Sequence, residues 1–376
     1  MKIAAISFTR AGARLSVQLK ERMERPGENS ADSLELFTKY SGSLDPDDKI
    51  NFPQEGLGAW TGKHFTTGEA LLFIGACGIA VRSIAPFIRS KTTDPAVLVM
   101  DEKGEFVIPI LSGHLGEANR IAGKIETLTG ARAVLTTATD VNHVFAVDVF
   151  AGRNGLYLSD MKKAKEVSAA LLEGEKITLY YDPRQLELEG EIPEGIAVSC
   201  LPDRQAEDWK APDRQAAGRQ MLNRQAAAHG VYLTCRERTE AALCLIPRQL
   251  YLGIGCRKGK SCAELRAFVT QTLGKYRLDR KALAGIYSID LKKEEAGIRE
   301  LARELGLDFH TFPAETLRAA EGEFHGSDFV KARTGVDNVC ERAVMAAGAE
   351  RILVPKTARD GMTLSIGIRK GKVRFE

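Results

Sequence analysis

Residues 71–130 read LLFIGACGIAVRSIAPFIRSKTTDPAVLVMDEKGEFVIPILSGHLGEANRIAGKIETLTG. The first run, LLFIG (71–75), is continuously apolar and ends in glycine, as is typical of a parallel strand covered on both faces. Two more apolar runs, VLVMD (97–101) and FVIPIL (106–111), flank the turn sequence Glu102-Lys103-Gly104. We expect these two runs to pair as a hairpin.

An amphipathic helix is predicted next. Apolar residues recur at helical spacing from Leu115 to Leu128, and Gly130 is a typical helix end. With Ser112 as the cap, His114 would lie in the first turn. Three more strands are predicted at KIAAISFT (2–9), ELFTK (35–39) and AVLTTAT (133–139). Because strands alternate with helices, residues 1–150 are expected to form an α/β domain with a mostly parallel sheet.

The rest of the chain divides into two further parts. Residues 151–245 are predicted to form a small α/β segment, with a helix that Ser159 or Asp160 can cap. An imperfect repeat rich in Arg, Gln and Ala spans 202–226 and is interpreted as a surface insertion. Residues 246–376 are predicted to be a separate C-terminal α/β domain. Its strands are expected at YLGIGC (251–256), LAGIYSID (283–290), RILVP (351–355) and, last, TLSIGI (363–368).

Composition argues against several classes of partner. The formal net charge is only +3, so neither a nucleic-acid nor a membrane partner is expected. The seven cysteines include no Cys-x-x-Cys pair, which favours a reducing compartment over a disulfide framework. The N-terminal apolar run is too short for a signal peptide, and no stretch approaches the ~20 apolar residues of a transmembrane helix. We therefore expect a cytoplasmic protein.

Polar loops after predicted strands are where α/β proteins place ligands. The first loop has two glycines whose backbone N–H groups suit an anion, followed by basic and polar side chains. Its candidate residues are Gly75, Gly78, Arg82, Lys91, Thr92 and Asp94. The alternative is an ordinary strand-to-helix turn with solvated basic residues.

The second loop, SGHLGEAN (112–119), places a histidine beside free backbone N–H groups. A neutral His114 is a candidate general base next to an oxyanion site, and Glu117 would orient it or be the base itself. Ser112, Gly113 and Asn119 are candidate substrate ligands. The alternative is that His114 only caps or packs the helix.

Two further loops hold candidates. The third, TTATDVN (136–142), offers Thr137, Asp140 and Asn142, with plain turn chemistry as the alternative. In the C-terminal domain the candidate ligands are Gly255, Arg257, Lys258, Ser327 and Lys356. Cys256 is a candidate nucleophile without a histidine partner nearby in the sequence. No zinc signature, P-loop or nucleophile elbow occurs, so the residues alone indicate an α/β protein for an anionic small molecule.

These loops also carry a resemblance. Residues 78–122, continued by TTATDVNHVFAVD (136–148), closely resemble the CbiG family, the cobalt-precorrin-5A hydrolases of anaerobic cobalamin biosynthesis. Four C-terminal blocks are similar to that family's C-terminal domain: GIGCRKGKS (253–261), SIDLKKEE (288–295), SDFVKARTGVDNVCERAV (327–344) and LVPKTARDGMTLSIGI (353–368). The resemblance covers most of the chain and is weakest at residues 1–55 and 151–245.

The resemblance implies a hydrolase that opens the δ-lactone of cobalt-precorrin-5A and releases the two-carbon unit as acetaldehyde, giving cobalt-precorrin-5B. Cobalt comes with the tetrapyrrole substrate, so no cofactor or metal ligand of the protein is implied. As a hypothesis, His114 is the base for water, and the N–H groups around Gly113 and Leu115 are oxyanion donors. Asp94 or Asp140 would orient groups or serve the second step. Substrate carboxylates would be held by Arg82, Lys91, Arg257 and Lys356.

Two other functions stay open. A non-catalytic tetrapyrrole-binding or carrier protein of the same pathway would keep the basic loops without needing His114. A nucleotide-binding α/β protein is disfavoured by the incomplete glycine fingerprint. The family setting also suggests a transient hand-off to precorrin methyltransferases, and a homodimer is left open.

Overall fold

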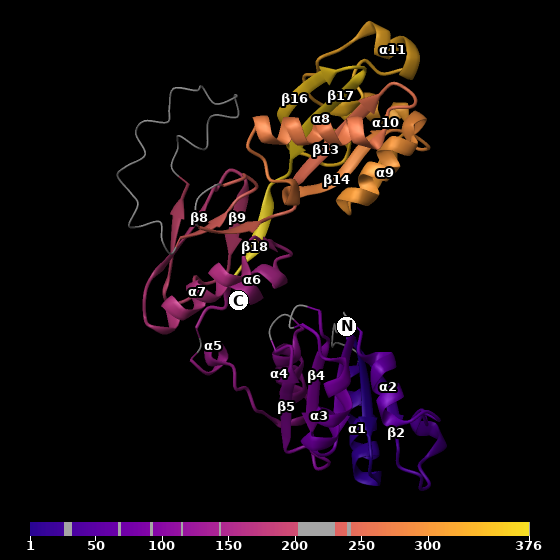
Figure 1. Ribbon diagram of the computed structural model, residues 1–376, viewed down its shortest axis with the longest axis vertical. Helices are drawn as coiled ribbons and strands as arrows, with labels where there is room; N and C mark the ends of the chain where they lie inside the picture. The colour runs from indigo at the N-terminus through magenta and orange to yellow at the C-terminus, as the bar shows by residue number, and fades with distance from the viewer. Residues whose placement is uncertain are drawn as a thin grey trace. The chain divides into compact units, whose positions relative to one another are not determined.

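The computed structural model describes residues 1–25, 32–66, 69–90, 93–113, 116–142, 144–201, 230–238 and 242–375. The chain divides into two compact units, Met1–His143 and Val144–Glu376 (Figure 1). Five of the sequence predictions fall outside the described residues: Lys91, Thr92, His114, Leu115 and the repeat at 202–226. The side chain of Asp140 is likewise not described.

The first unit is built on a six-stranded sheet with the order β2-β1-β3-β4-β5-β6. Its first four strands are parallel, as predicted: β2 (Ser33–Thr38), β1 (Lys2–Ser7), β3 (Glu69–Ile74) and β4 (Ala96–Met100). β5 (Phe106–Leu111) pairs antiparallel with β4, which confirms the hairpin. β6 (Arg132–Ala133) runs parallel to β5.

Helices cover both faces of this sheet (Figure 1). On one face, α1 (Arg10–Met23) and α4 (Ala118–Thr129) share a hydrophobic core with strand residues such as Leu72. On the other face, α2 (Leu57–His64) and α3 (Cys77–Ile84) do so with residues such as Phe73. Because side chains alternate along a strand, burial on both faces requires nearly continuous apolar strands, as in β3.

Two predicted elements of this unit are wrong in extent. Gly130 ends α4 in a left-handed conformation as predicted, but the helix begins only at Ala118, and its cap residue is Glu117 rather than Ser112. The first turn of α4 therefore begins at Ala118.

The predicted strand 133–139 is reduced to the two residues of β6, followed by α5 (Ala138–Val141). The carbonyl groups of Glu105 and Val107 accept N–H groups from the β6 segment. The next residue of β5 that faces that side is Pro109, which has no N–H to continue the ladder.

The second unit begins with a five-stranded sheet in the order β10-β8-β11-β12-β7. Its strands are β7 (Tyr157–Leu158), β8 (Ile177–Tyr181), β10 (Ile196–Cys200), β11 (Val231–Leu233) and β12 (Leu243–Ile246). Packed on it are α6 (Val147–Arg153) and α7 (Met161–Leu172). The carboxylate of Asp160 accepts the N–H groups of Lys162 and Lys163 and caps α7, as predicted.

One strand follows the segment predicted to be last. β18 (Gly371–Arg374) pairs parallel with β9 (Leu186–Glu189). Val373 and Phe375 join the hydrophobic core around α6 and α7. The end of the described chain is thus packed with residues that lie far earlier in the sequence.

A second five-stranded sheet in this unit has the order β15-β14-β13-β17-β16. Its strands are β13 (Leu250–Cys256), β14 (Leu283–Ile289), β15 (Phe309–Phe312), β16 (Arg351–Arg359) and β17 (Met362–Ile368). One face is covered by α8 (Cys262–Lys275) and α9 (Ala296–Leu305), the other by α10 (Ala314–Ala319) and α12 (Cys340–Ala346). α11 (Asp328–Thr334) contributes Val330 to the cluster that α10 and α12 form on this second face.

The close approach of α12 to β13 depends on Gly253, because a Cβ there would overlap the backbone oxygen of Cys340. We expect Gly253→Ala to lower the free energy of unfolding by about 1–3 kcal/mol, as measured by urea denaturation. Gly274→Ala is the matched control. Gly274 is exposed in α8, its added Cβ would meet nothing within 4 Å, and the helical alanine should stabilise by about 0.5–1 kcal/mol. Equal stability of the two variants would contradict the packing argument.

Candidate functional site

The β4–β5 hairpin carries the second predicted loop to the edge of the sheet where the parallel strands begin. Val97, near the start of β4, pairs with Leu111 at the end of β5. Gly75 lies at the opposite edge, where its N–H donates to the carbonyl of Met100. A strand of this length spans roughly 17 Å. Ser112 and Gly113 therefore lie at the edge of the sheet opposite to Gly75.

The second loop instead contacts the far end of the first loop, which α3 carries back to the same edge. The hydroxyl of Ser112 donates to the carbonyl oxygen of Asp94 at 2.9 Å. The Asp94 side chain is buried, and its Oδ2 accepts the N–H groups of Arg89 (2.9 Å) and Ser90 (3.0 Å). Asp94 thus shapes the loop that Ser112 contacts.

The third loop reaches the same edge. The side-chain amide of Asn119 donates to the hydroxyl of Thr137 at 3.4 Å, and the N–H of Asn119 donates to the carbonyl of Gly113 at 3.0 Å. A Cβ on Gly113 would lie 2.8 Å from the Asn119 side chain, so this glycine allows the approach. Of the predicted residues, Asp94, Ser112, Gly113, Asn119 and Thr137 are brought together here.

The backbone of the second loop is strained. Ser112 has a φ of 55° and Glu117 a φ of 67°, a region that residues with a Cβ adopt rarely. Gly116, which was not among the predicted residues, is required because its Cβ would overlap the side chain and backbone of Ser112. Such strain persists only where surrounding contacts hold it, and it occurs often at functional sites.

Glu117 is paired rather than free at this edge. Its carboxylate accepts two N–H groups of Arg120, at 2.9 and 3.1 Å. Arg120 also donates to both oxygens of Asp32, and Lys124 donates to Asp32 at 3.0 Å. Burial acts to raise the pKa of Asp32, but the hydrogen bonds from Arg120 and Lys124 outweigh it and hold that pKa far below the usual range. Asp32 lies 88 residues from Arg120, so no local pattern could have revealed the pair.

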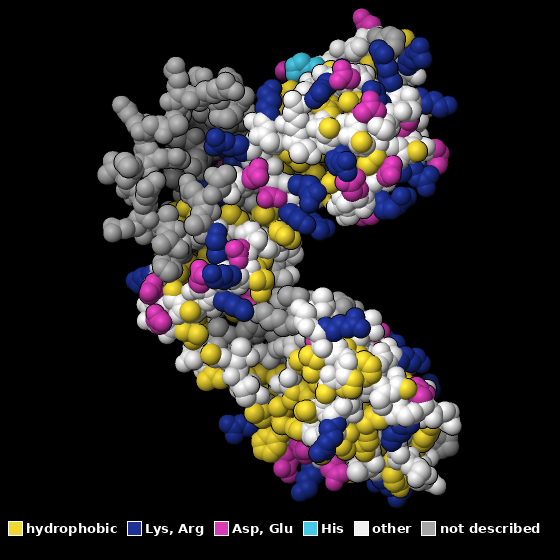
Figure 2. Space-filling view, viewed as in Figure 1, with side chains coloured by type: hydrophobic (Ala, Val, Ile, Leu, Met, Phe, Trp, Pro, Cys, Tyr) yellow, Lys and Arg dark blue, Asp and Glu magenta, His cyan; other side chains and the backbone are white. Residues whose placement is uncertain are grey.

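The remaining predicted residues of the first unit lie elsewhere. A Cβ on Gly78 would lie 3.4 Å from the guanidinium of Arg82, so these two residues are close together on α3. Asn142 directly follows α5, and its side-chain amide donates to the carbonyl of Ala138 in that helix. Figure 2 shows hydrophobic side chains gathered on the face of this unit that is turned to the viewer. On and just after α3, Val81 is 52% and Ile88 48% exposed, so Arg82 lies beside apolar surface.

In the second unit, two of the predicted residues follow β13. The N–H of Arg257 donates to the carbonyl of Gly361 at 2.8 Å, and Lys258 is exposed. The carbonyl of Gly255 accepts the hydroxyl of Thr363 at 3.3 Å. Burial raises the pKa of the Cys256 thiol, which disfavours the thiolate that a nucleophile needs.

Lys356 and Ser327 lie near the start of α12. The backbone N–H of Lys356 donates to Glu341 at 2.7 Å, and its ammonium group donates to the carbonyl of His325 at 3.2 Å. The N–H of Ser327 donates to the carbonyl of Asp337 at 2.9 Å. Neither His325 nor Glu341 was among the predicted site residues, because they lie 16 residues apart and fit no known spacing motif.

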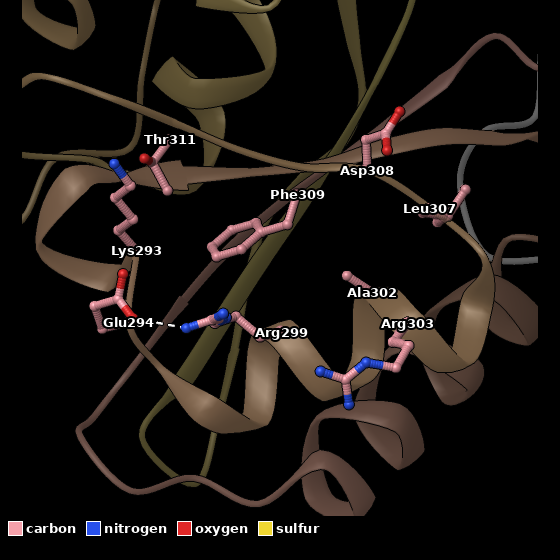
Figure 3. Close-up of a pocket in the computed structure, with 9 residues that line it drawn as sticks. All are labelled: Lys293, Glu294, Arg299, Ala302, Arg303, Leu307, Asp308, Phe309 and Thr311. Atoms are coloured by element: carbon pink, nitrogen blue, oxygen red, sulfur yellow. Dashed lines mark hydrogen bonds and ion pairs between the residues drawn. The ribbon is translucent and has the colours of Figure 1, made fainter.

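A hollow of about 400 Å³ opens at the β15 edge of the same sheet (Figure 3). Figure 3 shows Lys293, Arg299 and Arg303 around the ring of Phe309, with Arg299 paired to Glu294 at 2.6 Å. No predicted residue lines this hollow. Since β15 and β16 are the two edges of the sheet, the hollow and Lys356 lie on opposite edges.

Metal-binding clusters and membrane-spanning helices are both absent among the described residues. In that part of the chain, no three His, Cys, Asp or Glu side chains are grouped to hold a metal ion. Over the same residues, no helix combines the length and apolar character needed to cross a membrane.

The contacts of Asp32 with Arg120 and Lys124 predict how the free energy of unfolding depends on pH. Asp32→Asn leaves Arg120 and Lys124 without their buried carboxylate, so we expect a loss of about 3–5 kcal/mol in the free energy of unfolding at pH 7. The native pKa lies below the unfolded value, so the carboxylate stabilises the fold above about pH 4 and this effect disappears as the pH falls through the native pKa. The difference between wild type and variant should therefore shrink in acid.

Urea denaturation at several pH values measures this difference. Glu35→Gln is the control, because the Lys2–Glu35 pair is exposed (47% and 39%) and should contribute at most about 1 kcal/mol. A deficit in Asp32→Asn that does not change between pH 7 and pH 2 would show that the charge of Asp32 is not what stabilises this edge.

Three family models match successive parts of the chain. "Cobalamin synthesis G N-terminal" matches residues 59–140, "Cobalamin biosynthesis central region" matches 145–247, and "Cobalamin synthesis G C-terminus" matches 250–367. These are the three CbiG models.

Individual proteins are similar over most of the chain. A cobalt-precorrin-5A hydrolase of Salmonella typhimurium is 33% identical, covering 81% of this chain and 83% of that protein. A cobalt-precorrin-5A hydrolase of Priestia megaterium is 30% identical, covering 81% and 79%. The solved structure of CobE, a protein from the cobalamin biosynthetic pathway, is 32% identical over 33% of this chain and 92% of its own, with a TM-score of 0.31. The two hydrolases confirm the resemblance seen in the sequence blocks, and the chain belongs to the CbiG family.

Proposed function

We propose that this protein is a cobalt-precorrin-5A hydrolase. It would open the δ-lactone of cobalt-precorrin-5A and release the two-carbon unit as acetaldehyde, giving cobalt-precorrin-5B. The observation that carries the proposal is the 33% identity to a hydrolase of that name over 81% of the chain. The match of all three CbiG models supports it, because a carrier protein would not need to resemble a hydrolase over most of its length.

The strained loop 112–117 is the proposed place of lactone hydrolysis. Water has to lose a proton as it attacks the carbonyl carbon, and the developing oxyanion needs donors. We assign the first role to His114 and the second to the backbone N–H groups around Gly113 and Leu115. The contact of Ser112 with Asp94 supports this assignment, because it joins two loops around the proposed reaction centre.

Three carboxylates have supporting roles in this proposal. Asp94 or Asp140 would orient groups or serve the second step. Glu117 is given an orienting role rather than that of the base, because its carboxylate is engaged by Arg120. The same ion pair reduces the repulsion that a free glutamate would exert on an anionic substrate.

Basic side chains would hold the carboxylates of the macrocycle. Arg82 and Lys91 are proposed for this in the first unit, and Arg257, Lys258 and Lys356 in the second. The further proposed substrate ligands are Gly75, Gly78, Thr92, Asn119, Thr137, Asn142, Gly255 and Ser327. Cobalt is part of the substrate in this proposal. The cytoplasmic setting, the hand-off to precorrin methyltransferases and a homodimer remain predictions.

Acetaldehyde release separates the hydrolase from the carrier. The purified protein is incubated with cobalt-precorrin-5A without oxygen, and acetaldehyde is measured through NADH consumption by alcohol dehydrogenase. We expect one acetaldehyde per tetrapyrrole and a corresponding loss of mass in the pigment. Binding of the pigment without acetaldehyde would instead identify a carrier.

Two variants test the loop. His114→Ala should lower kcat by roughly 100- to 10,000-fold, the usual contribution of a general base. Ser112→Ala removes one hydrogen bond to Asp94 and should lower kcat/KM by roughly three- to tenfold. Ser83→Ala is the matched control, because its hydroxyl donates only to the Ile79 carbonyl within α3. Full activity of His114→Ala would remove the base assignment.

A further inference from the structure

A histidine and a buried glutamate meet at the start of α12. His325 Nδ1 lies 3.2 Å from Oε1 of Glu341. The glutamate side chain is 1% exposed, whereas the imidazole is 72% exposed. The carboxylate is therefore inside the protein and the ring that contacts it is in solvent.

Neutral donors hold this carboxylate in place. It accepts the backbone N–H of His325 at 2.9 Å, the backbone N–H of Lys356 at 2.7 Å and the side-chain amide of Asn338. The ammonium of Lys356 is directed to the carbonyl of His325 instead. Among the described residues, the imidazole is thus the one hydrogen-bonded partner of Glu341 that can become a cation.

The backbone is shaped to make these contacts. Val354 pairs with Ile366 and Thr357 with Leu364, so Pro355 and Lys356 of β16 oppose the single residue Ser365. This β-bulge turns the N–H of Lys356 out of the ladder and toward Glu341. Bulges of this kind are frequent next to active sites because they redirect single groups.

The ring is left with one free nitrogen. Nδ1 faces Glu341, and Nε2 has no partner in the part of the chain that the structure describes. A carboxylate at Nδ1 sets the tautomer in which Nδ1 carries the proton and Nε2 can accept one. Proteins use this arrangement to remove the proton of an alcohol.

We propose that His325 is a catalytic residue that takes the hydroxyl proton in the release of acetaldehyde, and that Glu341 positions it. This inference rests on the proposed function. Lactone opening frees a hydroxyl on the two-carbon unit. Nε2 takes its proton, the C–O bond becomes the C=O of acetaldehyde, and the C–C bond to the macrocycle breaks. The electron pair of that bond passes into the conjugated ring, which later takes the proton back from the imidazolium.

Groups of the same region suit the anionic product of the first step. The ammonium group of Lys356 donates to the carbonyl oxygen of His325. A carboxylate bound at the His325 ring would therefore lie near this ammonium group. Nearby, Nε of Arg342 donates to Oδ1 of Asp337 at 2.8 Å, so these two charged groups are paired with each other. A substrate carboxylate is therefore expected to meet Lys356 rather than Arg342.

The test follows both chemical steps with cobalt-precorrin-5A and the full-length protein. Mass spectrometry detects the ring-opened acid, heavier than the substrate by one water, and the coupled assay detects acetaldehyde. In His325→Ala we expect lactone opening at the wild-type rate, accumulation of the ring-opened acid, and acetaldehyde release slowed by roughly 100-fold or more. Added imidazole should restore release, because the site is open to solvent. His310→Ala, an exposed histidine on β15, is the matched control and should behave as wild type.

The outcomes separate the two proposals. Normal acetaldehyde release by His325→Ala overturns the inference and leaves the proposed function intact, and a block of lactone opening itself overturns the assignment to the second step. If the wild-type protein opens no lactone, the proposed function fails and the inference fails with it.

Glu341→Gln tests the positioning role separately. We expect a fall in kcat at unchanged KM, together with loss of the Nδ1-protonated tautomer of His325 in ¹⁵N NMR spectra. An unchanged tautomer would show that Glu341 does not orient the ring. Since His325 is exposed, the result for His325→Ala stands even if Glu341→Gln does not fold.

Discussion

The antiparallel pairing of β4 with β5 places the candidate groups of the first unit. It reverses the chain, so the loop at 112–117 lies where β4 begins, next to Asp94, rather than beside Gly75 at the opposite edge. The short β6, parallel to β5, brings Thr137 to the same edge. Without this reversal Ser112 could not contact Asp94, and the strained backbone of the loop would lose its support.

Two buried carboxylates in the protein are stabilised in opposite ways. The carboxylate of Asp32 accepts hydrogen bonds from the basic side chains of Arg120 and Lys124, which hold it as an anion. Glu341 is held by amides and faces an imidazole that can exchange its proton with a substrate. The first arrangement suits a structural role and the second a chemical one, because only the second leaves a proton acceptor open to solvent.

Local signals predicted much of the fold. The turn at Glu102-Lys103-Gly104 predicted the hairpin, and Gly130 predicted the end of α4. Asp160 predicted the start of α7. These three features could be predicted because each depends on residues that are neighbours in the sequence. The predicted cap at Ser112 was wrong because its hydroxyl donates to the carbonyl oxygen of Asp94, 18 residues away. The predicted strand at 133–139 ended early because Pro109, on the neighbouring strand, cannot donate.

The sequence by itself determined the α/β class, the family and the candidate loops, because apolar periodicity and long matching blocks are properties of neighbouring residues. Only the tertiary structure decided which of those loops share an edge, that Asp32 is paired with Arg120, and that His325 meets Glu341. These contacts depend on strand direction, on a β-bulge and on partners 16 to 88 residues apart, and a hydrogen bond across such a separation leaves no periodic trace in the chain.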